Sequence, residues 1–492
     1  MPLIPLELPP GAYRNGTEFE QSGRWRDMNL VRWRDGSLRP VGGWRLRAAT
    51  AYTGVPRGVI AWEDLSGDRR VAVGSFSNLY STSASGTTTD ITPVGFTSGN
   101  EIAAVNTGFG GGFFGSSYFG TERPDTGNFA EATTWAMDNW GEYLVACSNT
   151  DGKIYEWTLN IANPAVAVAN APVNNLSMMV TAERFLFALG AGGSPRLVQW
   201  SDREDNTTWT AADTNEAGDL ELQTAGQIMC GLKVRGQSLI LTDQDAHSAT
   251  YQGPPFVYSF ERVGQSCGII SRKASISVDA GAFWMGQEGF FSYSGGTVQE
   301  LPCDVSDYVF GDLNRSQASL IHAVPMAQHG EIWWFYPSGA SNECDRYVSL
   351  DYKEGHWTFG QIDRTCGVPR GVFKYPLWCD SLGNLWEQEV GLNYGGAPIF
   401  AESGPISLGV GEQVMSATSM IPDEGTQGDV TATFKTRFHP NDDERSYGPY
   451  SMANPTDVRF TGRQIRMRVD GTRLANWRVG TMRLEVTPGG KR

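Results

Sequence analysis

Few side chains in this sequence stand close enough together along the chain to do chemistry. The five histidines are isolated from one another, and the closest two of the seven cysteines, Cys366 and Cys379, are 13 residues apart. The sequence contains no H-E-x-x-H, Walker or C-x-x-C motif. We therefore expect no enzyme activity, no catalytic residue, no cofactor and no metal site. We interpret the cysteines as reduced, mostly buried thiols.

An acidic turn at residues 201–209, SDREDNTTW, comes closest to a functional signature. Asp202, Glu204 and Asp205 offer oxygen ligands of the kind that calcium prefers. The segment is weakly similar to the Asp-box turns of sialidase propellers, but the glycine of that turn is missing. An Asx-type turn that joins two strands is the simpler interpretation. A carboxylate pair for glycoside hydrolysis stays open, because 54 acidic residues make some close pairs inevitable.

The elements that carry these side chains repeat along the chain. An apolar strand, a turn, a second strand and a Trp or Tyr recur in copies that begin at residues 68, 141, 183, 236, 281, 330 and 377. A spacing of roughly 40–50 residues is typical of the four-stranded blades of a β-propeller. The sequence therefore predicts an all-β fold, with a propeller-like body of six to seven blades over residues 51–400.

Composition agrees with an all-β protein of more than one domain. The 59 glycines and 25 prolines leave little room for long helices, and 16 tryptophans suit tightly packed sheets. A chain of 492 residues is too long for one core. No segment approaches the ~20 apolar residues of a membrane span, and the N-terminus does not resemble a secretory signal. We expect no stable membrane insertion and synthesis in a cytoplasm.

The net charge of −15 is unevenly distributed. Residues 1–50 carry +3 and residues 459–492 carry +7, which leaves −25 for the residues between them. Only seven of the 39 basic residues are lysines, and arginine is the residue enriched at protein interfaces. Biased codon usage is an equally good explanation for the arginines. An acidic body with basic ends argues against a general nucleic-acid binder, which presents a wide basic face.

Residues 1–50 are expected to form an N-terminal arm and a hairpin. Early prolines keep the start of the chain extended, and Asp35-Gly36 between two short strands is a strong hairpin signal. Trp and Arg lie next to each other repeatedly here, which favours a docking arm for a neighbouring subunit. Surface cation–π contacts are the alternative. The candidate interface residues of this segment are Trp25, Arg26, Trp33, Arg34 and Trp44.

Residues 95–134 alternate glycines with aromatic residues. The segment has too many glycines for a packed strand and too many aromatics for a plain linker. We predict a projecting loop that docks on a partner, with a disordered tip as the alternative. Its candidate contact residues are Phe109, Phe113, Phe114 and Tyr118.

One short helix is predicted within the body. Asp304 is expected to cap it, and Val305, Val309 and Leu313 fall on one face at intervals of four residues. We interpret this helix as a packing element without chemistry.

The end of the sequence is predicted to form a linker and a second domain. Residues 401–428 are rich in Gly, Ser and Pro and read as a linker, whereas residues 429–492 alternate as in a small β-sandwich. Arg466 and Arg468 share one strand face, and we expect Arg483 to be placed similarly two strands along. These arginines could pair with acidic side chains of a neighbour or contact phosphates, with a solvated strand face as the alternative.

Three segments resemble structural proteins of tailed-phage virions. They are NLVRWRDGSLRPVGGW at 29–44, WAMDNWGEYLVAC at 135–147 and LVQWSDREDNTTWT at 197–210. The order of parts is similar to that of the tail hub or nozzle of short-tailed bacteriophages, the packaged DNA stabilisation family. The resemblance spans most of the chain, but its motifs are short and loosely spaced.

The resemblance implies a structural virion protein without catalytic residues. Six copies would form a ring below the portal and its adaptor, extend the channel through which DNA leaves and help to retain packaged DNA until ejection. Portal adaptor, a distal needle, fibre or spike, and transiently passing DNA are the implied partners. An acidic wall would let DNA slide, because it does not hold phosphates. A glycan-binding or glycan-cleaving tail-tip propeller is the alternative.

Overall fold

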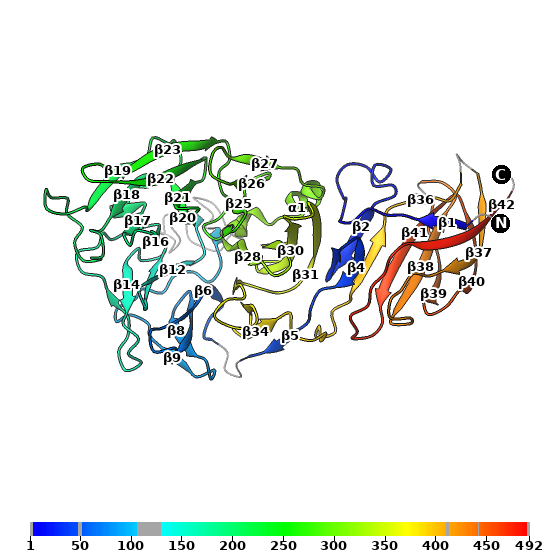
Figure 1. Cartoon of the computed structure of the whole chain (residues 1–492), viewed down its shortest axis with the longest axis horizontal. Coiled ribbons are helices and arrows are strands. Elements are labelled where there is room, and N and C mark those ends of the chain that lie inside the picture. The colour runs from blue at the N-terminus through cyan, green and yellow to red at the C-terminus, as the bar shows by residue number, and fades with distance from the viewer. Residues whose placement is uncertain (1–2, 48–51, 106–128, 410–412, 441, 490–492) are drawn as a thin grey trace, which may run out of the picture.

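A computed structural model describes residues 3–47, 52–105, 129–409, 413–440 and 442–489. A propeller built from the middle of the chain lies beside a β-sandwich to which both ends of the chain contribute (Figure 1). The predicted all-β fold, with a propeller body and a C-terminal sandwich, is confirmed.

The propeller consists of seven four-stranded antiparallel sheets. Blade 1 contains β6 (Pro56–Glu63), β7 (Arg69–Ser75), β8 (Leu79–Ser83) and β9 (Thr88–Asp90). Blade 2 contains β12 (Trp135–Trp140), β13 (Tyr143–Ser148), β14 (Ile154–Trp157) and β15 (Val166–Ala167). Blade 3 contains β16 (Ser177–Val180), β17 (Leu186–Leu189), β18 (Leu197–Trp200) and β19 (Gly218–Glu221). Blade 4 contains β20 (Ile228–Val234), β21 (Gln237–Thr242), β22 (Asp245–Gly253) and β23 (Val257–Gln265). Blade 5 contains β24 (Ser275–Val278), β25 (Gly281–Met285), β26 (Phe290–Tyr293) and β27 (Gln299–Leu301).

Blades 6 and 7 complete the ring. Blade 6 contains β28 (His322–Met326), β29 (Glu331–Pro337), β30 (Cys344–Asp351) and β31 (His356–Gln361). Blade 7 contains β32 (Cys366–Val368), β33 (Leu377–Cys379), β34 (Leu385–Gln388) and β5 (Trp44–Leu46). The first strand of each blade lies next to the axis, and β32 contacts β6 to close the circle. The seven repeats of the sequence coincide with the second and third strands of the seven blades.

Blade 7 is closed by a strand from the other end of the chain. β5 pairs with β34, so that Arg45 lies opposite Glu387. The Glu387 carboxylate accepts hydrogen bonds from Arg45 Nη2 at 2.5 Å and Arg47 Nη1 at 2.7 Å. The ring is therefore held together by a contact between two segments that lie far apart in the sequence.

Indole groups fasten neighbouring blades to one another. Trp135 Nε1 in blade 2 donates to the carbonyl of Ser75 in blade 1 at 2.7 Å. Trp334 Nε1 in blade 6 donates to Ala274 O at 3.0 Å, just before blade 5. Both side chains are fully buried, so each adds apolar area to the seam and satisfies its own N–H.

The sandwich has two sheets. One runs in the order β1 (Leu3–Leu6), β42 (Met482–Pro488), β37 (Met415–Ile421) and β40 (Thr456–Gly462). The other runs β2 (Trp25–Asn29), β35 (Phe400–Ser403), β41 (Gln464–Gly471), β38 (Val430–Arg437) and β39 (Arg445–Ser451), with β36 (Ile406–Ser407) also paired to β41. Phe434 and Phe460, one from each sheet, pack with ring centroids 5.0 Å apart.

Two expected boundaries differ from the structure. Residues 1–50 do not stand apart as an arm, because β1 and β2 belong to the sandwich and β5 to blade 7. Residues 401–428, expected as a linker, contain β36 and β37. In β37, Met415, Ala417 and Met420 are buried. The Ser and Thr residues between them make the segment resemble a polar linker, so its pattern of buried and exposed residues is hard to recognise in the sequence.

The predicted Asp-Gly hairpin is confirmed as β3 (Val31–Arg34) and β4 (Ser37–Pro40). Asp35 and Gly36 have φ angles of 52° and 73°, which is the left-handed pair that this tight turn requires. The hairpin lies at the junction of the two parts, where Leu30 N donates to the Tyr347 hydroxyl of blade 6 at 3.0 Å.

A short α-helix is present where it was predicted, as α1 (Ser306–Asp312), between blades 5 and 6. Val305, Val309 and Leu313 are buried, which confirms the expected face. The expected cap is wrong, because Val305 occupies the N-cap position without a side-chain hydrogen bond. The Asp304 carboxylate instead lies 3.5 Å from Arg24 Nη2. Two 3-10 turns are η1 (Ala191–Gly193) and η2 (Arg315–Leu320).

Candidate functional site

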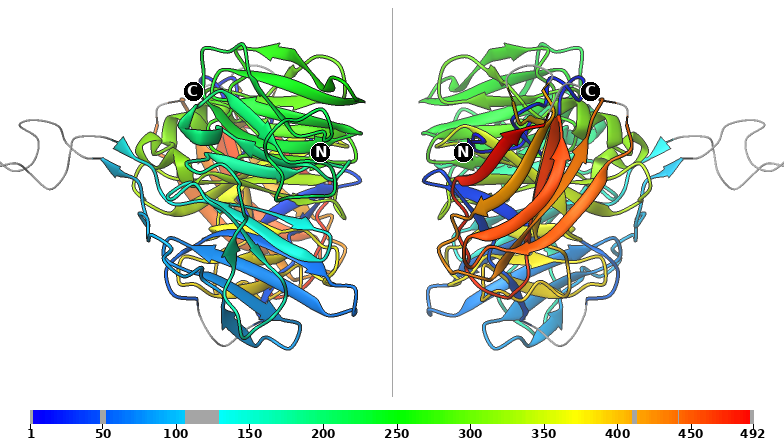
Figure 2. Two further views of the ribbon diagram at one scale, coloured as in Figure 1. Left: turned by 90° about the vertical axis from the view of Figure 1, so that its left-hand side faces the viewer. Right: turned by 90° about the vertical axis from the view of Figure 1, so that its right-hand side faces the viewer.

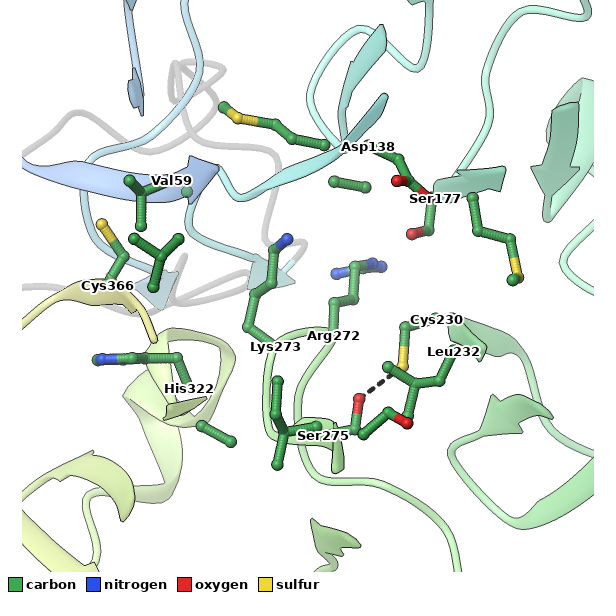
Figure 3. A pocket seen from close by; sticks show the side chains of 18 of the residues that line it. Val59, Asp138, Ser177, Cys230, Leu232, Arg272, Lys273, Ser275, His322 and Cys366 are labelled. Atoms are coloured by element: carbon green, nitrogen blue, oxygen red, sulfur yellow. Dashed lines mark hydrogen bonds between the residues drawn. The ribbon is translucent and has the colours of Figure 1, made fainter. Parts of the chain in front are cut away.

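A cavity of about 380 Å³ lies on the propeller axis, enclosed by the first strands of all seven blades. Its charged lining residues are Arg57, Asp138, Lys233, Arg272 and Lys273. Figure 3 shows Lys273 and Arg272 reaching from one segment just before β24 into the open space. The lining thus holds four cations and one carboxylate.

Three of the four cations have a carboxylate partner. Arg57 makes two contacts with Glu343, at 2.6 and 2.8 Å. Lys233 Nζ lies 2.9 Å from Asp138 Oδ2, and Arg272 pairs with Glu131. Among the described residues, Lys273 Nζ has no hydrogen-bond or ion-pair partner. Burial lowers the pKa of Lys273 below its ordinary value.

The neutral groups of the cavity are poorly suited to nucleophilic chemistry. Burial raises the pKa of the Cys230 thiol to about 11, and the sulfur lies 3.3 Å from Ser275 Oγ. Burial lowers the pKa of His322 to about 3, and its ring stacks on Phe335 with centroids 4.9 Å apart. At neutral pH the thiol is therefore protonated and the imidazole is uncharged.

The described ends of the segment that connects blades 1 and 2 contact residues at the cavity wall and before blade 6. Its short strands β10 (Ala104–Val105) and β11 (Phe129–Ala130) pair with each other and lie at one face of the propeller (Figure 2). Ala103 N donates to Gln317 Oε1 at 2.8 Å, which ties this segment to η2, before blade 6. The Glu131–Arg272 ion pair fastens the same segment to the cavity wall.

The predicted aromatic anchors of the N-terminal segment are mostly interior. Trp25 and Trp33 are 5% and 3% exposed, with ring centroids 5.8 Å apart. Trp44 is half-buried under Arg364, whose Cζ lies 5.1 Å from the ring centroid. Trp25 and Trp33 are therefore core residues and offer no free surface to a partner.

The two predicted arginines of that segment differ from each other. Arg26 pairs with Glu18 at 3.2 Å, within the chain. Arg34 is exposed at the end of β3. Of the five candidates in this segment, Arg34 is the side chain that the fold leaves most open.

The three C-terminal candidates do not form one surface. Arg466 pairs with Glu18 and Glu444, and Arg468 pairs with Glu402 and Asp470. Arg468 also lies over the Phe400 ring, 3.7 Å from its centroid. Arg483 is exposed on β42, in the other sheet. Their acidic partners are thus residues of this chain, and Arg483 alone among the three is left open.

The aromatic candidates Phe109, Phe113, Phe114 and Tyr118 lie outside the described residues. At the base of the same segment, Phe96 stacks on Trp135 with ring centroids 5.2 Å apart.

The acidic turn at 201–209 is an Asx-type turn between β18 and β19, as the simpler interpretation predicted. Asp205 Oδ1 accepts the N–H of Thr207 at 2.8 Å, and hydrogen bonds from Thr207 and Thr208 hold the pKa of Asp205 below its usual value. Glu204 points to Arg184 at 3.0 Å. The carboxylates of Glu204 and Asp205 therefore already have partners within this chain.

Residues 264–268 form a G-x-S-x-G pattern, which the prediction of no catalytic motif did not take into account. Ser266 is exposed with a φ of 53° and follows β23, but no helix begins after it. The nearest acid–imidazole pair is Asp245 with His247, 3.1 Å apart on β22. Gln265 is the last residue of β23, directly before Ser266. His247 Nε2 contacts the Asp245 carboxylate, and among the described residues no hydrogen bond joins either group to Ser266. The pattern therefore does not build a hydrolase site.

One group of side chains in the described part of the chain could share a metal ion. Ligand atoms of Asp351, Glu354 and His356 lie within 4.8 Å of one another. Asp351 Oδ1 already accepts the N–H groups of Lys353 and Glu354, at 2.8 and 2.9 Å, which shapes the β30–β31 turn. The cluster is explained by that turn.

Comparison with known proteins gives fold-level similarity alone. No family model matches the chain, and no curated protein matches it. Virginiamycin B lyase from Staphylococcus aureus is similar with a TM-score of 0.43 and 8% identity, over 70% of this chain and 99% of its own. BamB from Moraxella catarrhalis gives 0.38 and 11%, over 73% and 95%. An exo-β-1,3-galactanase from Phanerochaete chrysosporium gives 0.31 and 9%, over 91% and 100%.

No helix among the described residues is long and apolar enough to cross a membrane.

Proposed function

We propose that this chain is a structural protein of a phage tail, a nozzle or hub subunit that forms a homo-hexameric ring. The order of its parts, together with a rigid junction between propeller and sandwich, supports this proposal. Portal adaptor would bind one end of the ring and a needle, fibre or spike the other. The protein would act in the virion tail, without catalysis.

The junction is the observation that carries the proposal. Arg32, in the N-terminal hairpin, lies 2.8 Å from Glu331 of blade 6 and 2.6 Å from Glu389, just after blade 7. All three side chains are at most 11% exposed. Removing one partner of such a buried network is costly, so the hairpin is firmly attached to the propeller. A ring component that bears load needs this rigidity.

In such a ring DNA would pass between subunits, at the ring centre. The propeller cavity of about 380 Å³ is far too small to hold a turn of duplex DNA. The net charge of −15 agrees with a wall along which phosphates slide.

The glycan alternative receives little support from the cavity. No Trp, Tyr or Phe is among the described residues that line it, and Asp138 is the one carboxylate among them. Sugar sites combine aromatic platforms with polar groups, and glycoside hydrolysis needs two carboxyl groups. Exposed loops elsewhere are the remaining place for such a site.

Mass and symmetry test the proposal. The purified chain would be measured by light scattering and negative-stain imaging, alone and with the neighbouring tail proteins. A six-fold ring with a hole wide enough for DNA is the expected result. A persistent monomer or trimer that is retained on host polysaccharide would overturn it in favour of a receptor-binding part.

A further inference from the structure

We propose that the central cavity of the propeller binds a small multivalent oxyanion, such as inorganic phosphate, between Lys273 and Arg272. The two residues are consecutive, and both side chains enter the same space (Figure 3). This inference concerns the single subunit and does not depend on its assembly into a ring.

Charge within the cavity is unbalanced in favour of an anion. Glu343 neutralises Arg57, and Asp138 neutralises Lys233. Asp138 Oδ2 also accepts the N–H of Val180 at 3.1 Å, and Oδ1 accepts the N–H of Asn139 at 2.9 Å, so both carboxylate oxygens are engaged. Among the described residues, the ammonium of Lys273 is the cation left without a counter-charge.

Arg272 contributes further donors to the same space. A guanidinium carries five N–H donors, and Nη1 of Arg272 is the one that donates to Glu131. Nε of Arg272 is buried and has no partner among the described residues. Ser177, across the cavity on β16, adds a hydroxyl to the lining. Donors from two sides suit a tetrahedral oxyanion, which accepts hydrogen bonds in several directions.

An unpaired ammonium in an enclosed space is costly. It either gives up its proton or acquires a counter-ion, and burial does lower the pKa of Lys273. A bound oxyanion would remove that penalty and favour the charged amine. The volume of about 380 Å³ limits the ligand to a small molecule.

The test uses thermal unfolding of the full chain in sodium chloride and in sodium phosphate at equal ionic strength. We expect phosphate to raise Tm in a saturable way for the unchanged protein. Lys273→Met should lower the apparent affinity at least tenfold. Lys374→Met removes the same charge from an exposed loop and should leave the response unchanged.

Folding of the variant is checked in the same experiment. In chloride, Lys273→Met should unfold at or above the Tm of the unchanged protein, because a half-buried charge without a counter-ion has been removed. Sulfate and succinate serve as further probes. A Lys273-dependent response to sulfate but not succinate assigns a tetrahedral anion, and a response to both widens the class to carboxylates. Equal responses of Lys273→Met and the unchanged protein, or no response to any anion, would overturn the proposal.

Discussion

Arg32 Nη2 and Glu389 Oε1 lie 2.6 Å apart, although 357 residues separate them in the sequence. The pair joins the N-terminal hairpin to the end of blade 7, and Glu389 Oε2 also accepts the N–H of Gly42 at 3.0 Å. On its other side the same hairpin meets the C-terminal part of the chain, where Leu38 and Val479 exchange two backbone hydrogen bonds of 3.0 Å.

Replacing Arg32 with Met should destabilise the protein by about 3–5 kcal/mol, because Glu331 and Glu389 would be left as unpaired buried charges. Chemical denaturation measures the change. Arg34→Met, which removes an exposed charge two residues away, is the matched control and should cost less than about 0.5 kcal/mol. Equal effects of the two variants would contradict the role given to the junction.

Acid should weaken the same junction. Burial alone would raise the pKa of Glu389, but the charge of Arg32 and a hydrogen bond from His329 hold it at about 2. A lowered carboxyl pKa stabilises the fold above the ordinary value of 4.5, and this contribution is lost as pH falls from 4.5 towards 2. Glu389→Gln should flatten the pH dependence of stability in that window. An unchanged slope would show that Glu389 is not the group responsible.

His322 should make the propeller sensitive to acid in a higher window. Burial lowers its pKa to about 3, so between pH 6.5 and 3 the unfolded chain binds a proton that the folded chain does not. Stability should therefore fall by roughly 1.4 kcal/mol per pH unit as pH decreases through this window. His322→Gln should remove that slope in a series of urea titrations. The slope would persist if His322 were charged in the folded protein.

Closure of the ring should depend on β5. Replacing Trp44–Leu46 with Gly-Ser-Gly keeps the length of the chain but removes the strand side chains that hold blade 7, including Arg45 on Glu387. We expect a marked fall in Tm and faster proteolysis of the body. The same replacement of Thr88–Asp90, the outer strand of blade 1, is the control, because that strand does not close the ring. Similar losses from both replacements would argue against a special role for β5.

Charge reversal should separate the C-terminal arginines into two kinds. Arg466→Glu should lower the free energy of unfolding by about 1–3 kcal/mol, because it breaks ion pairs with Glu18 and Glu444. Arg483→Glu should leave Tm unchanged and weaken assembly, measured by light scattering with the neighbouring tail proteins. Normal assembly of Arg483→Glu would remove this arginine from the proposed interface.

The blades could be predicted because each carries its own local signal. The middle strands are apolar, and a tight turn such as Arg235-Gly236 between β20 and β21, where both φ angles are positive, marks where they begin. Outer strands such as β15, with two residues, leave almost no pattern. The partner of β5 could not be predicted at all, because pairing with β34 depends on an edge built some 340 residues later.

The residues of the candidate site were harder to predict from the sequence than the blades. The Trp–Arg pattern of the N-terminal segment does indicate tightly packed residues, but Trp25 and Trp33 pack within the chain. Lys273 and Arg272 are ordinary neighbours in the sequence. Their significance depends on an enclosure made by seven separate strands, and on which carboxylates happen to face each cation. Neither can be derived from spacing along the chain.

The pairing of β1 with β42 sets the order of events during translation. Leu3 lies opposite Glu485, so β1 has no partner strand until β42, more than 470 residues later, has been made. Contacts this distant in sequence form slowly, and incomplete chains expose unpaired strand edges. The sandwich is therefore completed only after β42 has been made, whereas every strand of the propeller, from β5 to β34, precedes that point. A chain truncated before β42 can close the propeller but leaves β1 without its partner strand.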